Sequence, residues 1–227
     1  VGQQVQREFF MLFWNTYRYL IGHATQENWQ PQDKLPASSD LTDKWILSRL
    51  NSTVRAVTGY LDRYHTAPAT EAIQQFVNDL STWYIRRNRN RHIAPILYTC
   101  LETLSLITAP FAPFFAEKIY QGLHPGKRES VHLKNWPQFD PSLIDTRLEQ
   151  TMDLVRQVGS LVHAARQKAG IKIRQPLASA TITTKRPSLN SEALDVIKQE
   201  TNVKEIRWQK SDSDTIKVEL DTNITPE

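Results

Sequence analysis

The sequence predicts a mainly α-helical protein, in which a helical bundle is followed by a long helix and a small α/β appendage. Apolar residues recur three and four positions apart over long segments, as they do on one face of a helix. Glycine is scarce, with 7 in 227 residues, which disfavours a turn-rich sheet protein. β-Branched residues become frequent after Pro176, which is typical of strands. We therefore divide the chain into a helical bundle (1–141), a long connecting helix with a basic linker (142–175) and a truncated β-α-β-β appendage (176–227).

Four helices are predicted in the bundle, over residues 5–23, 41–64, 68–91 and 96–123. Asp40 or Thr42 is the expected N-cap of the second helix, because short polar side chains accept hydrogen bonds from the first free N–H groups. The third helix carries a regular apolar stripe that includes Trp83 and Tyr84. Pro110 and Pro113 should kink the fourth, since proline removes a backbone donor.

A fifth helix is predicted over residues 143–169, after an extended linker at 136–141. Val158, Leu161 and Val162 are expected on its inward face, and Gly170 is placed to end it. In the appendage, strands are expected over 178–184, 203–209 and 215–220, with a helix over 189–200.

The composition narrows the compartment and the class of protein. A single cysteine, Cys100, cannot form an internal disulfide, so nothing points to secretion. No run of about 18 apolar residues is present, which argues against a membrane span. The first residues lack the layout of a signal peptide. We expect a cytoplasmic protein, of which this chain is a segment.

Positive charge gathers in two stretches that contain no acidic residue, although the net charge is only +4. The first lies between Asp79 and Glu102 and holds Arg86, Arg87, Arg89 and Arg91. The second lies between Asp153 and Glu192 and includes Lys168, Lys172 and Arg174. A polyanion would gain from both, because neutralised phosphates release counterions. The alternative is a solvated basic surface without a ligand.

No pattern of catalytic or metal-binding residues stands out. None of the six histidines forms a pair at ligand spacing with a third ligand nearby, and Cys100 has no cysteine partner. Neither a glycine-rich phosphate loop nor a nucleophile elbow occurs. We expect no active site, no metal and no cofactor in this chain.

Several segments resemble the anticodon-binding region of isoleucyl-tRNA synthetases, which are class I aminoacyl-tRNA synthetases. The most specific is 76–91, with its core Trp-Tyr-Ile-Arg-Arg-x-Arg at 83–89. The other segments follow in the order that the family has, at 12–19, 41–50, 109–120, 129–132, 169–176, 202–206 and 218–221. The resemblance covers nearly the whole chain.

The resemblance implies a helical bundle of the class I synthetase anticodon-binding type that grips the anticodon stem and loop of isoleucine-accepting tRNA. The parent would be a monomeric isoleucine–tRNA ligase that uses ATP and Mg, with its catalytic domain elsewhere in the same polypeptide. The chain departs from the family after Arg91, where an aromatic pair and a polar segment usually follow. It also ends before the cysteine-rich zinc module of some bacterial members.

The expected tRNA contacts are Arg86, Arg87, Arg89, Arg91, Lys168, Lys172, Arg174 and Trp83. At 100° per residue, Arg87 and Arg91 fall near the apolar stripe, with their guanidinium groups outward, and Arg86 and Arg89 fall opposite it. Arg87 could instead pair with an acidic residue of a neighbouring helix. Trp83 could stack on an anticodon base, but its place on the stripe favours packing in the core.

Two other functions fit the same residues. One is the equivalent region of a valyl-tRNA synthetase, against which the arginine run argues, because the valyl enzymes resemble this chain only up to Trp83-Tyr84. The other is a helical scaffold for protein partners, whose basic stretches serve only solubility. Salt-dependent tRNA binding separates the scaffold from both synthetases.

Overall fold

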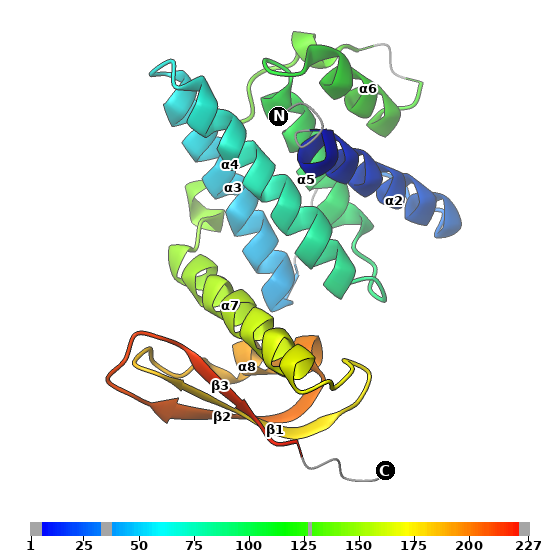
Figure 1. Ribbon diagram of the computed structural model, residues 1–227. Coiled ribbons are helices and arrows are strands. Elements are labelled where there is room, and N and C mark those ends of the chain that lie inside the picture. Colours follow the sequence, from blue (N-terminus) through cyan, green and yellow to red (C-terminus); the bar gives the residue numbers. More distant parts are fainter. Residues whose placement is uncertain (1–5, 33–37, 127–128, 223–227) are drawn as a thin grey trace. The chain divides into compact units, whose positions relative to one another are not determined.

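The computed structural model describes residues 6–32, 38–126 and 129–222, and for residues 6–8 the backbone alone. The chain divides into two compact units, 1–145 and 146–227. Figure 1 shows helices throughout the first unit, and the three strands all belong to the second. The mainly α-helical fold is therefore confirmed.

The first unit is a bundle of helices. In chain order its elements are the π-helix η1 (Gln6–Met11), α2 (Leu12–Gln26), α3 (Leu41–Leu61), α4 (Thr66–Asn78), the π-helix η2 (Asp79–Ile85), α5 (Ala94–Thr108), α6 (Pro113–Leu123) and the 3-10 turns η3 (Val131–Leu133) and η4 (Pro141–Leu143). The helix α3 packs on α4, and α5 contacts α2, α3 and α4. Trp45, Phe76, Tyr84 and Leu101 are all fully buried in this unit. The predicted start of the first helix at Val5 lies outside the described residues.

The ends of α3 are set by local chemistry. Asp40 is confirmed as the N-cap, since its side chain accepts hydrogen bonds from the N–H groups of Thr42 (2.8 Å) and Asp43 (3.4 Å). The helix ends at Leu61, earlier than predicted, because Tyr64 adopts a left-handed conformation with φ 58°. His65 N–H then donates to Tyr60 O, which closes the end of the helix.

The prolines divide the predicted fourth helix rather than kinking it. The helix α5 ends at Thr108, and Pro113 begins α6 as its first residue. Proline suits that position, since its missing N–H would have no partner in the first turn.

Residues 134–145, here called the return segment, run back along α3. Trp136 Nε1 donates to Thr58 Oγ1 (2.8 Å), and farther along the N–H of Asp140 donates to Asn51 Oδ1 (2.7 Å). The N–H of Asp145 then donates to Ser48 Oγ (2.8 Å). Residues 136–140 lack helix or strand, in line with the predicted linker at 136–141, whereas Pro141 begins the 3-10 turn η4. The whole segment is held along a polar face of α3.

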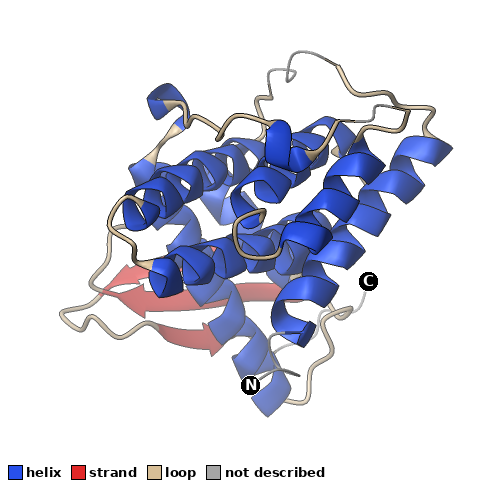
Figure 2. Cartoon of the chain, turned by 90° about the horizontal axis from the view of Figure 1, so that it is seen from above, coloured by secondary structure: helices blue, strands red, loops and turns tan. Residues whose placement is uncertain are grey.

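The second unit contains α7 (Thr146–Lys168), β1 (Leu177–Thr184), α8 (Ser191–Thr201), β2 (Val203–Lys210) and β3 (Lys217–Leu220). The strand order is β2-β1-β3, with β1 parallel to β2 and antiparallel to β3. The predicted order of β-α-β-β is confirmed, and Figure 2 shows the strands, in red, side by side in one sheet.

The helix α7, which the sequence suggested as a connector, packs on α8 and β3 within this unit. Val158 and Val162 are fully buried, together with Ile182 of β1 and Ile197 of α8. Leu161 is 37% exposed, so its predicted inward position is wrong.

Candidate nucleic-acid interface

The first basic stretch follows a change in helix type. The π-helix η2 continues α4 without a break and buries Trp83, Tyr84 and Ile85 in succession. A π-helix has more residues per turn than an α-helix. The spacing of 100° per residue used in the sequence analysis therefore does not apply within η2. Helical structure ends at Arg87 and a turn follows at 88–90, so the predicted helix end at Arg91 is wrong.

The structure places Arg86 and Arg89 at the surface, where both are exposed. Arg86 Nε donates to Thr82 O at 3.0 Å, which fixes the orientation of that side chain on the helix surface. These two residues face solvent, as the helical angles predict.

Arg87 lies across the ring of Trp83, with its guanidinium carbon 5.8 Å from the ring centroid. Trp83 is only 7% exposed and packs edge-on against Trp45, at 4.9 Å between centroids. A ring this buried cannot stack on a base. The expected tRNA contact at Trp83 is therefore wrong, and packing in the core is confirmed.

Arg91 does not hold its guanidinium outward. Its Nη1 lies 3.0 Å from Asp40 Oδ1 and its Nη2 lies 2.7 Å from Asp43 Oδ2. The outward orientation expected for its guanidinium group is therefore wrong, because the turn at 88–90 brings Arg91 to the start of α3. Arg91 thus makes an ion pair with the acidic residues at the start of α3.

This ion pair belongs to a buried polar network. Asp43 is 4% exposed and also accepts from Tyr84 Oη (2.7 Å). Burial first, and then the Asp43 carboxylate, raise the pKa of Tyr84 far above its usual range. Burial opposes ionisation of Asp40, but hydrogen bonds from Thr42 and the charge of Arg91 outweigh it and lower the pKa of Asp40.

The second basic stretch begins where α7 ends. Gly170 has φ 69°, and the N–H of Ile171 donates to Arg166 O at 3.0 Å. Glycine suits this position because it adopts positive φ without steric cost. Lys168, Lys172 and Arg174 are all exposed around this helix end.

A buried arginine underlies these exposed cations. Arg166 is only 1% exposed, and its Nη1 donates to Lys172 O (3.1 Å) and Gln175 O (3.0 Å). Its Nη2 donates to Asn202 O (2.8 Å). Sequence reasoning missed it, although it stands four residues after the buried Val162, where the apolar stripe continues.

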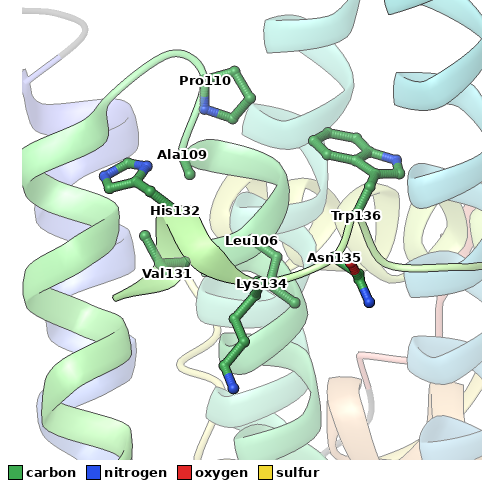
Figure 3. Close-up of a pocket in the computed structure, with 8 residues that line it drawn as sticks. All are labelled: Leu106, Ala109, Pro110, Val131, His132, Lys134, Asn135 and Trp136. Atoms are coloured by element: carbon green, nitrogen blue, oxygen red, sulfur yellow. The ribbon is translucent and has the colours of Figure 1, made fainter. Parts of the chain in front are cut away.

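Nothing in the described residues suggests covalent chemistry. A hollow of about 200 Å³ is lined by Leu106, Ala109, Pro110, Val131, His132, Lys134, Asn135 and Trp136 (Figure 3). It pairs no nucleophile with a base. Over residues 6–32, 38–126 and 129–222, no group of three or more histidine, cysteine or acidic side chains could hold a metal ion.

In the same residues, no helix combines the length and the apolar character that crossing a membrane would require. Guanidinium and ammonium groups donate hydrogen bonds to phosphate. The exposed cations of the two basic stretches are therefore suited to bind phosphate; they are Arg86 and Arg89 in one unit and Lys168, Lys172 and Arg174 in the other.

Comparison with known proteins gives a family match over residues 43–182, to the model described as the anticodon-binding domain of tRNA ligase. The isoleucine–tRNA ligase of Clostridium acetobutylicum is 40% identical over 97% of this chain and 23% of its own length. That of Clostridium novyi is 37% identical over 98% of this chain and 23% of its own. A solved ternary complex of Agrobacterium radiobacter K84 LeuRS, tRNA and LeuAMS covers 61% of this chain and 16% of that chain, at 20% identity and a TM-score of 0.46. The chain spans about a quarter of the length of the curated relatives it matches.

Proposed function

We propose a function from one premise: this chain belongs to the family of anticodon-binding domains of tRNA ligases. It binds the anticodon stem and loop of a tRNA, and the exposed cations of the two basic stretches contact the phosphates. The observation that carries the proposal is that Arg86 and Arg89, and likewise Lys168, Lys172 and Arg174, are exposed in stretches without acidic residues.

The proposal extends to the parent protein. The similarity to isoleucine–tRNA ligases over nearly the whole chain supports an isoleucine-accepting tRNA as the partner. The parent is then a monomeric, cytoplasmic ligase that joins isoleucine to its tRNA. ATP and Mg act in a catalytic domain in another part of the same polypeptide.

The test is binding of the chain to isoleucine, valine and leucine tRNA transcripts at several salt concentrations. We expect the tightest binding to isoleucine tRNA, with affinity falling steeply as salt rises. Equal binding to the valine tRNA would favour the valyl alternative. Absence of salt-dependent binding to any of the three would contradict the proposal.

Paired variants test the two stretches separately. Arg86→Ala with Arg89→Ala should weaken binding and lower the salt slope by about one unit for each lost phosphate contact. Lys172→Ala with Arg174→Ala should do the same, and the two effects should add if the stretches touch separate phosphates. Arg18→Ala with Arg55→Ala is the matched control, since both arginines are exposed outside these stretches. Unchanged binding in the Arg86 and Arg89 double variant would remove that surface from the tRNA contact.

A further inference from the structure

The turn Lys172–Gln175 is held from its inner side by two residues. The N–H of Gln175 donates to Lys172 O at 3.0 Å, which closes the turn. The carbonyls of Lys172 and Gln175 both accept from the buried Arg166, and Ile173 O accepts from Asn202 Nδ2 at 3.0 Å. Since Arg166 also donates to Asn202 O (2.8 Å), the two residues form one clamp.

The clamp determines where the amide groups of the turn point. The described part of the chain, which includes this turn, contains no cis peptide, and in a trans peptide the C=O and the following N–H point in opposite directions. Because the carbonyls of Lys172 and Ile173 face the clamp, the N–H groups of Ile173 and Arg174 face away from it. Neither amide donates a hydrogen bond to any described residue.

The outward side of the turn therefore combines two amide donors with two cationic side chains. Lys172, Ile173 and Arg174 are all exposed there. Successive N–H groups that point the same way form an anion site, and adjacent ammonium and guanidinium groups strengthen it. The clamp contributes no carboxylate among the contacts of Arg166, so its positive charge adds to the site.

We propose that this turn binds one backbone phosphate of the tRNA through the N–H groups of Ile173 and Arg174, assisted by the Lys172 and Arg174 side chains. Arg166 and Asn202 are positioning residues, which fix the turn without touching the RNA. The inference rests on the proposed function and adds to it a specific phosphate site and the clamp that shapes it.

The discriminating variant is Asn202→Gly. Asn202 has φ 51° at the end of α8, a conformation that glycine adopts readily. The change therefore removes the side-chain donor to Ile173 O and retains the backbone. We expect tRNA affinity to fall about tenfold, as for loss of one charge-assisted contact, with a lower salt slope and an unchanged melting temperature.

The experiment measures isoleucine tRNA binding by the whole chain for Asn202→Gly, for the Lys172→Ala and Arg174→Ala pair, and for all three changes combined. Lys204→Ala is the control for lost charge, since Lys204 is exposed on β2 of the same unit. If Asn202 acts through the turn, the combined variant loses less affinity than the sum of the two separate losses, because the changes affect one shared phosphate site. Wild-type affinity of Asn202→Gly, or a loss that simply adds to that of the pair, overturns the inference. Failure of the wild-type chain to bind tRNA overturns the proposed function itself.

Discussion

Two arginines organise the two basic stretches, and their partners differ. Arg91 lies between the carboxylates of Asp40 and Asp43, at 3.0 Å and 2.7 Å. Arg166 is more deeply buried, at 1% exposure, and is surrounded by backbone carbonyls. Both fix a turn that displays basic side chains. The charge of Arg91 is neutralised by carboxylates, whereas that of Arg166 is balanced only by carbonyl dipoles.

The difference in partners means that an arginine can hold a turn in place without attracting an anionic ligand, or can do both. The carboxylates of the first network cancel the field of Arg91, so we expect any attraction for phosphate there to come from the other arginines of that stretch. In the second network the field of Arg166 persists and adds to that of Lys172 and Arg174. A buried charge is costly unless well satisfied; three carbonyl oxygens accept from the two Nη atoms of Arg166, while its buried Nε has no partner among the described residues.

The largest expected effect comes from the first network. Asp43→Ala leaves Arg91 and the Tyr84 hydroxyl without their buried partner, so the first unit should lose about 3–5 kcal/mol of stability. Urea unfolding followed by hydrogen exchange in that unit measures the loss. Asp62→Ala, at an exposed position after α3, should change stability little. A loss below about 1 kcal/mol would mean that the network contributes little to the fold.

The carbonyl clamp should cost somewhat less to break. Arg166→Met retains most of the volume but removes the donors to Lys172, Gln175 and Asn202. Unsatisfied buried carbonyls should destabilise the second unit by about 2–3 kcal/mol. Hydrogen exchange should show faster opening of α7 and β1 and no change in the first unit. Lys168→Met, an exposed change on the same helix, serves as the control, and equal effects of the two would contradict the clamp.

A smaller effect is expected at Arg87, which lies across the ring of Trp83. Arg87→Ala should cost about 1 kcal/mol of stability, the size of a partly desolvated cation–π contact, and should also weaken tRNA binding. Arg86→Ala should weaken binding alone, because its side chain is exposed. Denaturant melts and binding curves for both variants test this, and equal melts would show that the Trp83 contact adds nothing.

The smallest expected effect is a difference between the two networks in how folding stability depends on pH. The pKa of Asp40 is lowered in the folded state, so its contribution is present above the unfolded value of about 3.9 and is lost as pH falls below it. The Asp40 side chain is 37% exposed, so screening should limit the contribution to less than about 1 kcal/mol. Asp40→Asn should therefore reduce stability at pH 7 more than at pH 3. The carbonyl clamp has no acid to protonate, and α7 should keep its exchange protection over this range.

The features that the sequence predicted correctly depend on local rules. Asp40 caps α3 because its short side chain reaches the first amides, and Gly170 ends α7 because it tolerates positive φ. The alternation of strands and helix after Pro176 follows from β-branched residues and their spacing. These signals lie within a few residues of their effect.

The features that it missed depend on contacts distant in the chain. The π-helix places three successive residues in the core, and no local propensity marks it. Arg91 meets Asp43 across 48 positions, and Arg166 meets Asn202 across 36. Within the arginine run, the sequence therefore identified the exposed pair, Arg86 and Arg89, and misjudged Arg91.

The return segment has a mechanical consequence. Traced back from Asp145, the segment makes hydrogen bonds to α3 first at Ser48, then at Asn51 and then at Thr58. A pull on the chain beyond Asp145 would load the bond to Ser48 first and the others only after it failed. The return segment would detach from α3 one hydrogen bond at a time, so modest tension would extend residues 134–145 and leave the core of the bundle intact.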